Sequence, residues 1–86
     1  ERPDSYEATL LSGLVRRRAG GTDAALDFYR RAGALKPEAV EAPFNEGMLL
    51  RDLGRLGEAR IVLRRLAERH PEHEPTRRAL EALGSP

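Results

Sequence analysis

Apolar residues in the middle of the chain recur with the period of an α-helix. One set falls at positions i, i+3, i+4 and i+7 of a single helical face: Ala25, Phe28, Tyr29 and Ala32. The same spacing returns further along the chain, at Ala59, Val62, Leu63 and Leu66. Each set predicts an amphipathic helix that buries one stripe of side chains and exposes the remainder.

Chain-breaking residues divide the sequence into five predicted helices. Ser5 is the expected N-cap of the first helix, and either Thr22 or Asp23 is the expected N-cap of the second. Gly20 and Gly21 permit the left-handed turn between these two helices. Glycine or proline also ends each later helix. The predicted helices span about residues 6–18, 23–35, 41–53, 56–69 and 75–83.

The chain repeats itself with a period of 34 residues. A shift by 34 aligns identical residues at twelve positions, among them Gly13/Gly47, Gly20/Gly54, Ala25/Ala59 and Pro37/Pro71. Glycine inside a helix costs about 1 kcal/mol relative to alanine, so its recurrence at 13 and 47 needs a reason. We expect close approach of a partner helix there, with Ala25 and Ala59 as the small residues on the other side.

This pattern of small residues, glycine, alanine, bulky apolar residue and proline resembles the tetratricopeptide repeat family. The resemblance implies an all-α fold, an α-solenoid of antiparallel helical hairpins wound as a right-handed superhelix. It implies one domain over residues 1–86, with repeat 1 at about 6–39, repeat 2 at about 40–73 and a capping helix at about 75–83. Pro3 stands one period before Pro37, so we expect the chain to be a fragment of a longer protein.

In that family the first helix of each hairpin lines a concave face that binds an extended or helical peptide. Carried onto this sequence, the partner-binding residues are Leu10, Leu14, Arg17, Arg18, Phe44, Met48, Arg51, Asp52 and Arg78. Helical spacing agrees, because Leu10, Leu14 and Arg17 fall on one face. An apolar floor with an arginine edge suits an amphipathic protein or peptide partner with acidic flanks.

Two alternatives to peptide binding stay open from the sequence. The apolar positions Leu10 and Leu14 would also suit a buried contact with a second copy of the chain, which makes a homodimer an alternative. The other alternative is an accessory domain of a larger enzyme, whose catalytic part would lie outside these 86 residues.

Composition argues against several other functions. A net charge of +1 and 5% aromatic residues argue against nucleic-acid binding, despite the run Arg16-Arg17-Arg18. The longest apolar runs have three residues, so no membrane insertion is expected. Cysteine is absent, which removes disulfides and thiolate chemistry and is compatible with a reducing compartment such as the cytoplasm.

Candidate catalytic and metal-binding chemistry is weak. His70 and His73 flank a loop with Glu72 but lack a third fixed ligand, so no metal site is expected. Gly20-Gly21 is not followed by the lysine of a phosphate-binding loop. No serine lies in the sequence context of a nucleophile elbow. We therefore expect a binding protein with no catalytic residues and no cofactor.

Overall fold

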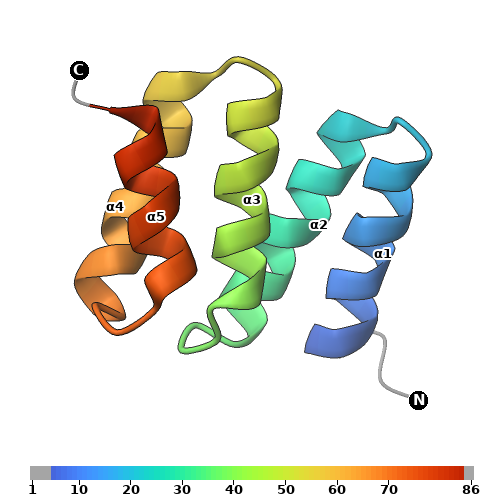
Figure 1. Ribbon diagram of the computed structural model, residues 1–86. Coiled ribbons are helices and arrows are strands. Elements are labelled where there is room, and N and C mark those ends of the chain that lie inside the picture. Colours follow the sequence, from blue (N-terminus) through green and yellow to red (C-terminus); the bar gives the residue numbers. More distant parts are fainter. Residues whose placement is uncertain (1–4, 85–86) are drawn as a thin grey trace. The chain divides into compact units, whose positions relative to one another are not determined.

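The computed structural model describes residues 5–84, and every regular element within that range is an α-helix. The helices are α1 (Tyr6–Arg18), α2 (Thr22–Leu35), α3 (Glu41–Asp52), α4 (Leu56–Arg69) and α5 (Glu74–Leu83) (Figure 1). The predicted all-helical fold with five helices is confirmed, and no predicted boundary is off by more than one residue. Pro3, on which the expectation of a preceding repeat rested, lies outside the described residues.

The helix ends follow from local backbone chemistry. Ser5 caps α1, because its Oγ accepts a hydrogen bond from the Ala8 N–H at 3.3 Å. The predicted caps of α2 were wrong: the N-cap is Gly21, and no side chain caps this helix. The turn before α2 is closed by the backbone itself, since the Gly21 N–H donates to the Arg16 carbonyl at 2.7 Å. The helix therefore starts directly at Thr22, without a side-chain cap.

The chain forms two compact units, which divide between Ala42 and Pro43. In the first unit α1 packs along α2. The face of α2 that meets α1 carries the predicted stripe, of which Ala25, Tyr29 and Ala32 are fully buried. Phe28 is only partly buried, with the guanidinium carbon of Arg31 4.9 Å from its ring centroid.

Gly13 is the point of closest approach in the first unit. A Cβ atom added to Gly13 would lie 2.7 Å from Cε1 of Tyr29 and 3.2 Å from Cβ of Phe28. The predicted close approach is therefore confirmed, but the nearest residues are bulky rather than the small Ala25 that was expected. The missing side chain on α1 makes room for the Tyr29 ring.

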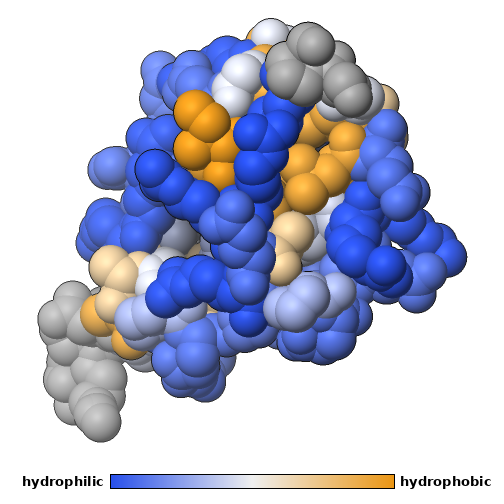
Figure 2. Space-filling model, turned by 90° about the vertical axis from the view of Figure 1, so that its left-hand side faces the viewer, coloured by the Kyte–Doolittle hydropathy of each residue, from blue (hydrophilic) through white to orange (hydrophobic). Residues whose placement is uncertain are grey.

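The second unit contains α4, α5 and all but the start of α3. Its close approach is at Gly47, where an added Cβ would lie 2.6 Å from Cδ2 and 2.7 Å from Cγ of Leu63. Here too the neighbour is bulky, and the expected small partner, Ala59, is not among the nearest atoms. On the side that carries α4 and α5, apolar surface is crossed by hydrophilic side chains (Figure 2).

α5 is anchored at its beginning by a buried polar contact. Thr76 is fully buried, and its hydroxyl lies 2.7 Å from Nδ1 of His73, the residue just before the helix. His73 in turn meets the ring of Phe44 edge-on, with centroids 5.5 Å apart and an angle of 79° between the planes. A buried hydroxyl without a partner would be costly, so this bond fixes where α5 starts.

The sequence period is also a period of the backbone. α4 begins and ends 34 residues after α2. The Gly20 N–H donates to the Arg17 carbonyl at 3.0 Å, and Gly54 donates to Arg51 at 2.9 Å. Both glycines have positive φ, +90° and +79°, a conformation that favours glycine. A turn closed by corresponding hydrogen bonds therefore joins α1 to α2 and α3 to α4.

The contact at Gly47 predicts that alanine there is destabilising, although alanine is the better helix former. Overpacking a filled space costs about 1–3 kcal/mol, against roughly 1 kcal/mol gained from helix propensity. We expect Gly47→Ala to lower the free energy of unfolding by about 1 kcal/mol. Chemical denaturation followed by circular dichroism measures this quantity.

Gly33 provides the matched control, because it lies within α2 and nothing lies within 4 Å of the position of its Cβ. Gly33→Ala should raise the free energy of unfolding by up to about 1 kcal/mol. If both substitutions stabilise the protein, the close approach at Gly47 is not a constraint.

Candidate functional site

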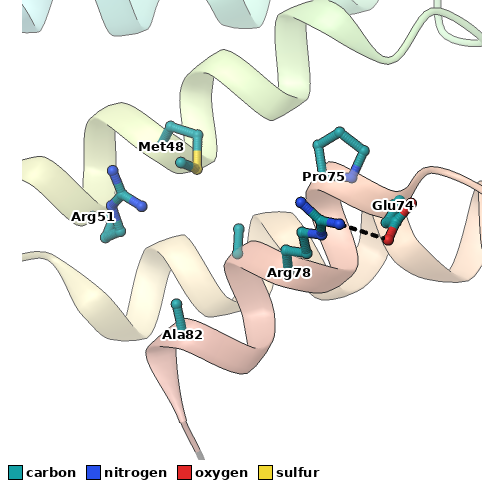
Figure 3. A pocket seen from close by; sticks show the side chains of 7 residues that line it. Met48, Arg51, Glu74, Pro75, Arg78 and Ala82 are labelled. Atoms are coloured by element: carbon teal, nitrogen blue, oxygen red, sulfur yellow. Dashed lines mark hydrogen bonds and ion pairs between the residues drawn. The ribbon is translucent and has the colours of Figure 1, made fainter.

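A groove lies between α3 and α5 in the second unit (Figure 3). Its volume is about 400 Å³, and it is lined by Met48, Arg51, Glu74, Pro75, Arg78, Ala79 and Ala82. Three of the predicted partner-binding residues, Met48, Arg51 and Arg78, thus come together in one place. They are drawn from two helices that are separated by a complete third helix in the sequence.

Small side chains on α5 create the space. Ala79 and Ala82 fall one helical turn apart and both line the groove. Met48 of α3 lies across the groove from Ala82 (Figure 3). Met48 is partly buried, and Ala82 is exposed. A thioether adapts its shape to different neighbours, so this floor can accept apolar side chains of various shapes.

Both arginines of the groove hold a neighbouring carboxylate. Nη2 of Arg78 lies 3.0 Å from Oε2 of Glu74, one turn earlier on α5 (Figure 3). Nη2 and Nε of Arg51 lie 3.0 Å and 3.3 Å from Oδ1 of Asp52. All four side chains are well exposed, so these ion pairs contribute little to stability. A guanidinium has five N–H donors, so each arginine keeps donors for a further acceptor.

Phe44 is placed differently from the other predicted residues of this unit. It does not line the groove; it packs on His73, where α5 begins. Asp52 does not line the groove either, but it accepts hydrogen bonds from Arg51, which does. Sequence reasoning placed no weight on Pro75 and Ala79, which line the groove, because small residues carry no chemical signal of their own.

In the first unit, three predicted residues lie on one depression of α1. Leu14, Arg17 and Arg18 line it together with Leu11 and Val15, and its volume is about 570 Å³. Leu11 and Val15 were not predicted, although 59% and 57% of their surface is exposed. Leu11 lies three residues before Leu14 and four before Val15, so it neighbours both on the helix surface.

Leu10 lies outside this depression and is partly buried. Leu10 lies about 100° around the helix from Leu11 but only about 40° from Leu14, because successive residues are about 100° apart. The two leucines that the sequence assigned to one groove floor therefore differ in their surroundings.

A tyrosine and a glutamate form the most perturbed polar pair in the first unit. The Tyr6 hydroxyl donates to Oε1 of Glu41 at 3.0 Å, and Nζ of Lys36 lies 5.4 Å from the centre of the Tyr6 ring. Burial, followed by the hydrogen bond and negative charge of Glu41, raises the pKa of Tyr6 to about 12. At the start of α1, a backbone N–H and the Ser5 hydroxyl lower the pKa of the Glu7 carboxyl.

The histidines of the loop before α5 have partners other than a metal. Nδ1 of His70 lies 3.5 Å from Oε2 of Glu72, and Nδ1 of His73 contacts Thr76. Among residues 5–84, no group of three or more histidine, aspartate or glutamate side chains is arranged to hold a metal ion. In the same range, no helix has both the length and the apolar character needed to cross a membrane.

No protein-family model matches this sequence, and no curated protein matches it either. The function of the chain has to be inferred from its repeated hairpins, from the α3–α5 groove and from the depression on α1.

The Tyr6–Glu41 bond predicts a pH dependence at the alkaline end. The folded-state pKa of about 12 lies above the usual value of 10.0, so folding favours the neutral hydroxyl. The stability that this bond contributes is complete below about pH 10 and is lost as the pH rises toward about 12. We expect Glu41→Gln, which keeps an acceptor but removes the charge, to lower the pKa of Tyr6.

Ultraviolet titration of tyrosinate measures this pKa. The chain has two tyrosines, so the titration is best made in a Tyr29→Phe background. The Tyr29 hydroxyl is buried without a hydrogen-bond partner among residues 5–84. Removing this hydroxyl therefore leaves no other buried polar group without a hydrogen bond. An unchanged titration midpoint in Glu41→Gln would show that Glu41 does not act on Tyr6.

Proposed function

We propose that this chain is a tetratricopeptide-type repeat domain, whose hairpins stack as a right-handed α-solenoid, and that it is a protein-binding scaffold and not an enzyme. The fold assignment is supported by the repeated construction of the hairpins. Gly13 faces Tyr29 and Gly47 faces Leu63, and both pairs are related by the same 34-residue shift. Repeats of this kind stack their neighbours to bury a continuous core.

The observation that carries the binding role is the α3–α5 groove, where Met48, Arg51 and Arg78 meet. An apolar side chain of a partner would rest between Met48 and the two alanines of α5. A carboxylate beside it would accept hydrogen bonds from the guanidinium of Arg51 or Arg78. The proposed partner is therefore a peptide, or an exposed segment of a protein, in which acidic residues flank an apolar one.

The existing ion pairs of Arg51 and Arg78 would not prevent these arginines from binding a partner's carboxylate. Each is paired with a carboxylate of its own helix across an exposed ion pair, which is worth at most about 1 kcal/mol. An acidic partner can share or displace these carboxylates at little cost. The side chains of the groove offer no hydroxyl or thiol nucleophile, and its one carboxylate, Glu74, is bonded to Arg78. Binding is thus favoured over catalysis for this surface.

A random peptide library displayed on phage tests the proposal. Peptides selected on the 86-residue chain should be enriched in aspartate and glutamate around an apolar residue. Hydrogen bonds to charged groups are worth about 1.5–3 kcal/mol, so we expect Arg51→Ala and Arg78→Ala each to weaken binding about tenfold or more. Fluorescence anisotropy with a labelled selected peptide measures the dissociation constants.

Arg65→Ala is the matched control, because Arg65 is an exposed arginine of α4 outside the groove. Its binding should equal that of the unchanged chain. Ala82→Trp, which fills the groove from an exposed position, should abolish binding while the helical circular dichroism spectrum is retained. Selected peptides whose affinity is insensitive to all of these groove substitutions would refute this site.

A further inference from the structure

The outer face of α1 exposes a stripe of large apolar side chains. Leu11, Leu14 and Val15 are 59%, 40% and 57% exposed and lie together on one side of the helix. Leu11 and Val15 point away from α2, because each is two residues from Gly13, which packs on α2. Leu49, one period after Val15, is only 3% exposed. The apolar stripe of α1 is therefore an exposed apolar patch of the kind that marks a protein–protein interface.

Charged residues extend this stripe at both ends. Glu7, Leu11, Leu14 and Arg18 are spaced by four, three and four residues, which is the spacing of one seam in a helix pair. Glu7 lies in the first turn of α1, and Arg18 is its last residue; both are exposed. The stripe is thus acidic at its beginning, apolar in its middle and basic at its end.

Two copies of this stripe complement each other when they lie antiparallel, because the acidic end of one then faces the basic end of the other. The midpoint of the stripe falls between Ser12 and Gly13, so an antiparallel copy aligns Leu11 of one chain with Leu14 of the other. The same alignment places each Glu7 opposite an Arg18 of the other chain. A parallel copy would instead align like charges, which repel one another.

We infer that the outer face of α1 binds a second copy of this chain in antiparallel orientation, with the Leu11–Leu14 contact repeated on either side of a two-fold axis. Such a contact is isologous, as in most homodimers. A helix of 13 residues is about 20 Å long, so the buried area is at the small end of protein interfaces. The dimer is accordingly weak and depends on protein concentration.

Disulfide cross-linking tests the orientation directly, because the chain contains no cysteine. In the antiparallel pair, position 7 of one copy lies opposite position 18 of the other, whereas two copies of position 7 lie about 16 Å apart. Disulfides require Cα atoms within about 7 Å. A mixture of Glu7→Cys and Arg18→Cys should therefore form a mixed disulfide several times faster than either variant forms its own.

Glu7→Cys mixed with Arg65→Cys on α4 sets the background for random collision. A mixed 7–18 product no faster than this background would overturn the proposal. Rapid self-cross-linking of Glu7→Cys alone would overturn the antiparallel orientation, since it requires the two copies of position 7 to meet.

Charge reversal tests the same pairing without a covalent bond. Sedimentation equilibrium should show that Glu7→Arg or Arg18→Glu weakens dimerisation about threefold or more. The double variant, in which both charges are exchanged, should recover the original dissociation constant. Failure of the double variant to recover it, with the helical spectrum intact, would contradict the Glu7–Arg18 pairing.

The dimer contact is independent of the α3–α5 groove. Leu11→Glu should abolish dimerisation and leave the affinity for groove-binding peptides unchanged. Conversely, Arg51→Ala should weaken peptide binding and leave the dimer dissociation constant unchanged, which would show that the two surfaces act independently.

Discussion

The contact between a glycine of one helix and a bulky side chain of the next is the constraint on which each hairpin depends. Gly13 leaves room for the ring of Tyr29, and Gly47 leaves room for Leu63. A side chain at either glycine would push the helices apart, because the nearest atoms that it would meet belong to Tyr29 and Leu63, which are fully buried. The position of α1 against α2, and of α3 against α4, is set at these points. This packing also determines which faces of α1 and α3 stay exposed and can contact another molecule.

The helices themselves could be predicted because their signals are local. Glycines in the left-handed conformation and prolines at helix starts mark the ends of helices wherever the chain folds. The residue that fills the space beside Gly13 could not be predicted, because helical periodicity places Ala25 and Tyr29 on one face without saying which is nearer. The start of α2 was misassigned for a related reason, since a backbone turn there replaces a side-chain cap.

The candidate groove was only partly predictable. Met48 and Arg51 lie one turn apart on α3, so their proximity follows from helical spacing. Arg78 joins them only because α5 packs beside α3, which is tertiary information. The contribution of Ala79 and Ala82 is a small side-chain volume, and the sequence alone does not show which helix lies opposite these alanines. Leu11 and Val15 of the apolar stripe on α1 were missed although their spacing is regular, because the same spacing also describes a buried face.

The repetition of the backbone has a consequence for how such a chain can change in length. The turns at Gly20 and Gly54 are closed by corresponding hydrogen bonds, and α4 begins and ends 34 residues after α2. A stretch of 34 residues that is cut within α2 and at the equivalent position of α4 can therefore be duplicated or deleted, and the new junction joins backbone of matching conformation. Unequal recombination of the coding sequence would add or remove whole hairpins without creating a foreign loop. The number of hairpins can then change separately from the packing within any one hairpin.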